Sequence, residues 1–310
     1  MPRLLPALFA LAVLLAPLCC GGGAVLTAGD SALLAPANLD AWCIVPFDPA
    51  KRGSEARAAM LQGLGITKLA YDWRDEHIPT FDAEIEALQR HGIELTAWWY
   101  PGHRQEILDT IARHHIHPQL WVCGAARPGG APVGDAQRTE AEAQRILPLA
   151  KEAAALGCRI GLYNHREAWY ENQDNQIAII ERLRRDGIDN VGIVFNFHHY
   201  RGAAGEFAAR FTRMQPYLIA LNLNGMPADP AAYPAVRTVG TDAGELAMLR
   251  VVVASGWQGP VGLIHERPAM DAAEGLARSL RGLAWLRQEL VQPGAGGAQP
   301  SEQDPPPPHL

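Results

Sequence analysis

The fold class is clearest in residues 159–199, which read RIGLYNHREAWYENQDNQIAIIERLRRDGIDNVGIVFNFHH. This segment begins with an apolar run at 159–164, continues through an amphipathic stretch at 175–186, and ends with a second apolar run at 191–197. Continuous apolar runs are typical of parallel strands that helices cover on both faces. Gly187 lies just beyond the amphipathic stretch, where a helix would end. The segment therefore predicts a β–α–β unit.

The same unit recurs along most of the chain. Apolar runs predict strands at 39–47, 66–73, 93–100, 119–123, 159–164, 191–197, 218–223 and 260–265. Amphipathic stretches predict helices at 54–64, 80–91, 104–114, 136–156, 175–186, 205–214, 243–255 and 272–290. Eight matched units within about 255 residues favour a single closed (β/α)₈ TIM barrel over an open doubly wound sheet. A dinucleotide site has no support, because no predicted strand is followed by a Gly-x-Gly-x-x-Gly turn.

The N-terminal residues have the composition of an export signal. Arg3 supplies a positive charge, and an almost unbroken apolar run follows at 4–18. This run is too short for a membrane span, so residues 1–24 are predicted to be a signal peptide. Cys19 and Cys20 raise a lipid anchor as an alternative form of processing. We therefore expect an exported protein, periplasmic or extracellular, without a transmembrane helix in its mature form.

The rest of the chain divides by composition. Residues 25–37 are expected to be a linker, 38–292 the barrel, and 293–310 a disordered tail rich in proline and glycine. Hydrophobic residues make up 48% of the chain, which allows a large core. The net charge is −6 and no basic run occurs, so nucleic acid is not expected as a partner.

Polar and aromatic residues gather at the carboxyl ends of the predicted strands, where barrels of this class carry their sites. The candidate site residues are Tyr71, Asp72, Trp98, Tyr163, His165, Asn196, His198, His199, Asn222, Asn224, His265 and Glu266. Side chains alternate along a strand, so Asn196 shares a face with His198, and Asn222 with Asn224. His199 faces outward unless its strand has already ended. Amides and imidazoles beside tryptophan and tyrosine suit a neutral ligand rich in hydroxyl groups.

Several of these residues also have a purely structural interpretation. Asp72 could pair with Arg74 or cap the following helix. Glu266 could pair with Arg267, and Asn222 and Asn224 could form a turn before Gly225. Of Trp98 and Trp99, only one can face the mouth of the barrel.

Taken together, these residues resemble the xylose isomerase-like TIM barrels, the sugar phosphate isomerase/epimerase superfamily. The similarity covers about residues 38–290. It rests on Tyr-Asn-His at 163–165, Asn-Phe-His-His at 196–199, Leu-Asn-Leu-Asn-Gly at 221–225 and Gly-Pro-Val-Gly-Leu-Ile-His-Glu at 259–266. The resemblance implies one divalent metal, held by Glu, Asp, His and Glu on strands five to eight.

This chain departs from that ligand set at three of the four positions. Tyr163 stands where the first Glu is expected, Asn196 where the Asp is expected, and Asn222 where the His is expected; Glu266 matches. Carboxamide is a weak, neutral ligand. His165, His199 and Glu266 could instead form a rebuilt site for Mn²⁺, Zn²⁺ or Mg²⁺.

Two classes of function are compatible with these residues. The first is an exported isomerase or epimerase of a non-phosphorylated sugar or keto-sugar, with Glu266, His198 or His199 as the base. Asn196, Asn222 or a metal would then stabilise the oxyanion. The second is a carbohydrate-binding barrel that has lost catalysis. A lyase or hydrolase acting on an oxidised sugar would use the same groups.

Overall fold

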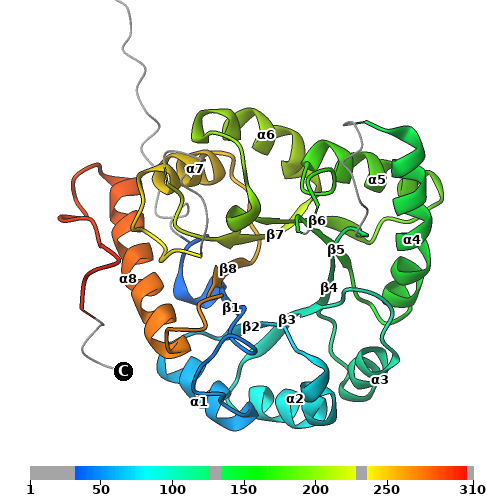
Figure 1. The fold of residues 1–310 in the computed structure, drawn as a ribbon, viewed down its shortest axis with the longest axis horizontal. Helices are drawn as coiled ribbons and strands as arrows, with labels where there is room; N and C mark the ends of the chain where they lie inside the picture. The colour runs from blue at the N-terminus through cyan, green and yellow to red at the C-terminus, as the bar shows by residue number, and fades with distance from the viewer. Residues whose placement is uncertain (1–31, 126–133, 166, 228–235, 306–310) are drawn as a thin grey trace, which may run out of the picture.

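The computed structural model describes residues 32–125, 134–165, 167–227 and 236–305. Eight parallel strands close into a barrel in chain order, and the last strand pairs with the first. A ring of helices surrounds the strands (Figure 1). The predicted (β/α)₈ barrel is therefore confirmed. The predicted signal peptide, residues 1–24, lies outside the described residues.

The strands are β1 (Leu39–Trp42), β2 (Lys68–Tyr71), β3 (Glu94–Trp99), β4 (Gln119–Val122), β5 (Ile160–Tyr163), β6 (Val191–Asn196), β7 (Leu218–Leu223) and β8 (Val261–Ile264). The α-helices are α1 (Ser54–Gly63), α2 (Phe81–Arg90), α3 (Gln105–His114), α4 (Ala136–Ala155), α5 (Gln173–Arg185), α6 (Phe207–Met214), α7 (Ala243–Ala254) and α8 (Ala272–Val291). Short 3₁₀ helices are η1 (Pro36–Asn38), η2 (Asp75–Thr80), η3 (Phe197–His199), η4 (Ala204–Glu206) and η5 (Gln215–Tyr217).

The predicted element boundaries agree with these bounds to within two residues, with one exception. The first strand was predicted to run to Phe47, but β1 ends at Trp42. The next residue, Cys43, has φ 58°, in the left-handed region that ends a strand. This early end brings Trp42 to the rim of the barrel.

The barrel has two layers of packing. Inside it, Trp42, Trp121, Tyr163, Val194 and Ile264 belong to one buried cluster of inward-facing side chains. A larger apolar layer, in which residues such as Leu69, Phe195 and Leu221 are fully buried, packs against the helices. Each strand thus alternates between the two layers, which decides which strand-end residues reach the mouth.

The segment before β1 packs onto the barrel. Leu33 and Leu34, in the expected linker, are buried. The Asn38 side-chain amide donates hydrogen bonds to the carbonyls of Leu33 and Gly259, at 2.8 and 2.7 Å. The packed unit therefore begins several residues before Asn38. Within the described part of the chain, no helix is long and apolar enough to cross a membrane.

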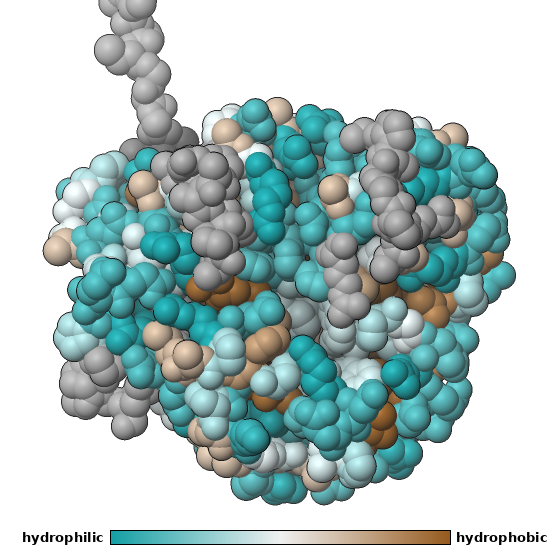
Figure 2. Space-filling model, viewed as in Figure 1, coloured by the Kyte–Doolittle hydropathy of each residue, from teal (hydrophilic) through white to brown (hydrophobic). Residues whose placement is uncertain are grey.

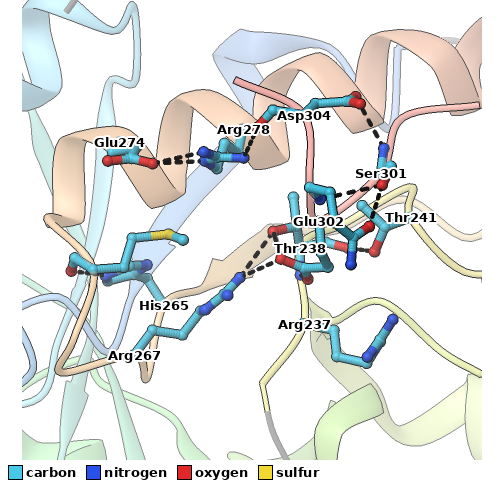
Figure 3. A network of polar contacts seen from close by, with 12 residues as sticks. Arg237, Thr238, Thr241, His265, Arg267, Glu274, Arg278, Ser301, Glu302 and Asp304 are labelled. Atoms are coloured by element: carbon cyan, nitrogen blue, oxygen red, sulfur yellow. Dashed lines mark hydrogen bonds and ion pairs between the residues drawn. The ribbon is translucent and has the colours of Figure 1, made fainter. Parts of the chain in front are cut away.

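The segment after α8 differs from the disordered tail that its composition predicts. Glu302 accepts hydrogen bonds from the backbone N–H of Thr238 at 2.6 Å and from Arg267 at 2.8 Å (Figure 3). The backbone carbonyl of Asp304 accepts a hydrogen bond from Arg278 of α8 at 2.7 Å. These partners lie far away in the sequence, so local composition did not reveal them. They fasten residues 293–305 to α8 and to the loop after β8.

Candidate functional site

A cavity of about 550 Å³ opens at the carboxyl ends of the strands. Its lining includes Trp42, Phe47, Trp73, Trp99 and Tyr163, together with the polar residues Cys43, Asp72, Arg74, Arg104, His165, His199 and Glu266. Figure 2 looks down the molecule as Figure 1 does; the surface is mostly hydrophilic, with hydrophobic residues showing near its centre. The volume is within the range of small-molecule sites.

The aromatic part of the lining is a connected group of rings. Tyr163 of β5 stacks on Trp121 of β4, with ring centroids 5.7 Å apart and planes 19° apart. Trp42 and Trp99 approach Tyr163 edge-on, at 5.7 and 5.5 Å. These contacts fix the ring orientations, and aromatic faces of this kind can cover the C–H surface of a sugar.

The Tyr163 hydroxyl is buried within a small polar network. Trp42 Nε1 donates a hydrogen bond to it at 2.9 Å, and the Asn196 side-chain nitrogen donates a second. Burial raises the pKa of the Tyr163 phenol well above its usual value. The hydroxyl is therefore neutral at any physiological pH.

The imidazole groups come together because β6 ends early. The strand stops at Asn196, and η3 turns the following residues, so that His199 reaches the cavity. Its ring centroid lies 4.6 Å from that of His165. Burial, together with His165 and His198, lowers the pKa of His199 to about 2. His199 is thus an uncharged hydrogen-bonding group rather than a cation.

Two carboxyl groups face the cavity from the strands on either side of β1. Asp72 follows β2, and Glu266 follows β8. Asp72 Oδ1 accepts a hydrogen bond from the Val45 backbone N–H at 3.2 Å, whereas Oδ2 has no hydrogen-bond partner among the described residues. Burial raises the pKa of Asp72 to about 7, against the opposing effect of Arg74. Burial likewise raises the pKa of Glu266, and Arg74 again opposes it.

Three of the predicted site residues lie outside the cavity. Tyr71 and Trp98 are fully buried against each other and Phe81, on the helix side of the barrel. The His265 ring packs beside Gly275 of α8, and its Nε2 lies 3.1 Å from the Met270 carbonyl oxygen. Each is the immediate neighbour of a residue that does face the cavity, and adjacent strand residues point in opposite directions.

Three further predicted residues do not line the cavity either. Asn196 is fully buried and bonded to Tyr163. His198 lies behind His199, with ring centroids 4.7 Å apart; burial and Arg201 lower its pKa to about 4. Asn224 bonds to the loop after β7, accepting a hydrogen bond from the Arg237 backbone N–H at 2.8 Å. The expectation that Asn196 and His198 enter the mouth together is therefore not met.

Asn222 is enclosed inside the barrel. It is fully buried and does not line the cavity. A Cβ atom on Gly262 of β8 would come within 1.9 Å of Asn222 Oδ1. Within the described residues, neither its amide oxygen nor its amide nitrogen has a hydrogen-bond partner. Asn222 is therefore badly placed to stabilise an oxyanion at the mouth.

Most of the cavity lining was not selected by the sequence-based prediction, and three of these residues illustrate why. Trp42 and Cys43 were placed in the middle of a longer first strand, so neither was considered a strand end. Arg74 Nη1 bonds to the carbonyls of Asp72 and Trp73, at 2.7 and 2.8 Å, and its guanidinium remains in the cavity lining. The left-handed φ of Cys43 had no signal in the sequence, because glycine is the residue that usually marks it.

The residues present do not fit the implied divalent metal. The four expected ligand positions hold a phenol engaged with Trp42 and Asn196, two carboxamides, and Glu266 as the single carboxylate. Across the described ranges, no three histidine, cysteine, aspartate or glutamate side chains converge as metal ligands would. His165, His199 and Glu266 all line the cavity but do not form such a group.

Comparisons with known proteins identify relatives through structure only. No protein-family model matches the chain, and no curated protein matches it in sequence. Its structural neighbours are xylose isomerase-like TIM barrel proteins.

One neighbour is the IolI protein with a bound zinc atom, at 12% identity and TM-score 0.64, covering 83% of this chain and all of that one. A second is the 3-keto-D-glucoside 4-epimerase YcjR from E. coli, at 16% identity and TM-score 0.59, covering 81% of this chain and 99% of that one. A third is a D-psicose 3-epimerase, at 14% identity and TM-score 0.60, covering 82% and 99%. Identities this low show a shared fold and no more.

Proposed function

We propose that this chain is an exported sugar isomerase or epimerase, which binds a non-phosphorylated sugar or keto-sugar at the barrel mouth and moves a proton next to its carbonyl group. The observation that carries the proposal is the composition of one cavity. Aromatic rings, the neutral imidazole of His199 and the carboxyl group of Glu266 all line it. Two of the structural neighbours are epimerases of sugars or sugar derivatives, which supports this class of substrate.

The charges in the cavity favour a neutral ligand over a phosphorylated one. Four carboxyl groups line it, from Asp72, Asp75, Glu76 and Glu266, against two guanidinium groups, from Arg74 and Arg104. A phosphate dianion would meet more negative than positive charge there. Hydroxyl groups, in contrast, can pair with His165 and His199 while the tryptophans cover the ring carbons.

Glu266 is the base in this proposal. Its raised pKa makes the carboxylate a stronger base than an exposed glutamate, closer to the operating pH. It takes the proton from the carbon next to the carbonyl, and the electron pair of that C–H bond moves toward the carbonyl oxygen. A proton delivered to the opposite face of the same carbon completes an epimerisation. A proton delivered to the former carbonyl carbon, while the neighbouring hydroxyl proton passes to the former carbonyl oxygen, completes an isomerisation; neither reaction involves net oxidation.

The test is exchange of carbon-bound hydrogen in deuterium oxide. Purified protein is incubated with D-fructose, D-psicose and a 3-keto-D-glucoside, and deuterium incorporation next to the carbonyl is followed by NMR. We expect incorporation by the wild type and a loss of at least 100-fold in Glu266→Gln. Glu86→Gln, at an exposed position on α2, is the matched control and should keep the wild-type rate. Full activity in Glu266→Gln would remove this residue from the mechanism.

One observation favours a second candidate, a carbohydrate-binding barrel without turnover. Three of the four expected metal ligands are replaced by neutral groups, while aromatic rings and the neutral imidazole of His199 still line the cavity. The same experiment separates the two functions. Thermal stabilisation by a sugar, with no deuterium incorporation into any of the three substrates, would establish the binding protein instead.

A further inference from the structure

The Tyr163 hydroxyl oxygen lies between two N–H donors. Trp42 Nε1 donates to it at 2.9 Å, and the Asn196 side-chain nitrogen donates as well. The Asn196 amide cannot be reversed, because its Oδ1 accepts the backbone N–H of His198 at 2.9 Å. Neither neighbour offers Tyr163 an acceptor, so the phenolic proton must point elsewhere.

The cavity that Tyr163 lines is where a ligand could accept that proton. Among the residues that the structure describes, Tyr163 Oη makes these two hydrogen bonds and no others, and both are accepted. Tyr163 also lines the cavity. A hydroxyl that accepts two hydrogen bonds becomes a stronger donor, because linked hydrogen bonds polarise one another.

We propose that the Tyr163 hydroxyl takes the place of a divalent metal in this barrel, by donating a hydrogen bond to the ligand oxygen on which negative charge develops. The catalytic part of this inference rests on the proposed function, whereas the binding part does not. Trp42 and Asn196 act as positioning residues, since they hold the phenol oxygen and leave its proton for the ligand.

The step balances without any further reagent. Glu266 removes the proton from the carbon next to the carbonyl, a carbon–carbon double bond forms, and the carbonyl π electrons move onto oxygen. Tyr163 keeps its proton and shares it with that oxygen. When Glu266 returns the proton to carbon, the electrons move back and the carbonyl is restored. Loss of a donor of this kind typically slows a reaction by about 100- to 1000-fold.

The test uses glycolohydroxamate, whose planar oxygens imitate an enediolate, in buffer that contains EDTA. Binding is measured by calorimetry on the full chain. We expect Tyr163→Phe to bind the probe at least 10-fold more weakly than the wild type, because the ring remains and the donor is lost. Tyr71→Phe removes a buried hydroxyl outside the cavity and should bind like the wild type.

Asn196→Asp provides a sharper variant, because it keeps the phenol but redirects its proton. A carboxylate oxygen in place of the amide nitrogen accepts from Tyr163 and turns the proton away from the ligand. The same loss of probe binding is therefore expected. If Tyr163 only packs against its neighbours, this variant should bind the probe as well as the wild type does. Thermal unfolding checks that each variant is folded.

Three results would overturn the assignment: equal binding by the wild type and a folded Tyr163→Phe, no binding by the wild type, or binding that Mn²⁺ tightens more than 10-fold when it replaces EDTA. The last two need only the wild-type protein. A fourth outcome has a different meaning. The wild type could bind the probe more tightly than Tyr163→Phe and yet show no deuterium exchange in the sugar assay. It would refute the proposed proton transfer and leave Tyr163 as a binding donor.

Discussion

Asp40 of β1 is expected to make the unfolding free energy depend on pH. Its side chain is buried at the end of the barrel opposite the cavity. Thr96 Oγ1 lies 2.6 Å from Asp40 Oδ1 and 3.1 Å from the Leu69 carbonyl oxygen. One threonine proton cannot serve both acceptors. If Asp40 is protonated, it can donate to Thr96, and Thr96 can donate to Leu69, so all three groups are satisfied.

The pKa of Asp40 agrees with this arrangement. Burial raises it to about 7, against the opposing effects of Thr96 and Lys68. A folded-state pKa above the unfolded value means that the folded state binds the proton more tightly. The stabilisation is complete below the unfolded pKa near 3.8 and is lost as the pH rises through 7. Between pH 5 and pH 8 about two units of this shift titrate, which corresponds to roughly 2–3 kcal/mol.

Asp40→Asn imitates the protonated form, because its amide nitrogen can donate to Thr96 at every pH. Urea unfolding of the wild type and the variant at pH 5, 6, 7 and 8 gives the difference in unfolding free energy. We expect this difference to move by roughly 2–3 kcal/mol in favour of Asp40→Asn between pH 5 and pH 8. We compare the variant with the wild type at each pH because burial also raises the pKa of Asp72 to about 7, and its contribution cancels in the comparison. Asp189→Asn, at an exposed position, should show a constant difference. A constant difference for Asp40→Asn would refute the reasoning.

Two other substitutions test packing and the C-terminal segment. Tyr71→Phe removes a buried hydroxyl without a hydrogen-bond partner among the described residues, so it should leave the unfolding free energy unchanged or raise it by up to about 1–2 kcal/mol; a loss above 1 kcal/mol in urea unfolding would contradict this. Glu302→Gln weakens the hydrogen bonds from Thr238 and Arg267 and should lower the melting temperature by about 3–6 °C at pH 7. An unchanged melting temperature would show that the Glu302 contacts do not stabilise the barrel.

The fold was predictable because its signals are local and repeated. Each helix and strand carries its own apolar pattern, and glycines such as Gly187, with φ 78°, mark the helix ends. The one misplaced element boundary lies where the local apolar pattern does not determine the backbone conformation. β1 continues into apolar residues after Trp42, and no sequence pattern marks the left-handed turn at Cys43.

The site was harder to predict because a shift of one residue reverses a side chain's direction. Asp72 and Glu266 line the cavity, while their neighbours Tyr71 and His265 pack toward the helices. His199 illustrates the same point in reverse. It would have faced outward on a longer strand, and it reaches the cavity because the strand ends three residues earlier. The sequence could therefore place the site at the rim without deciding which residues enter it.

The replacements on β5 and β6 are coupled through one hydroxyl, which is an argument for a rebuilt site over a decayed one. Tyr163 needs a donor at position 196, since an aspartate there would accept the phenolic proton and keep it from a ligand. Asn196 can be that donor because the His198 backbone fixes its orientation, and Trp42 completes the arrangement from β1. Random loss of metal ligands would not be expected to produce two side chains that satisfy each other. Asn222 differs in this respect, because neither of its side-chain polar atoms has a hydrogen-bond partner among the described residues. The contrast supports the proposed hydrogen-bond donor at Tyr163.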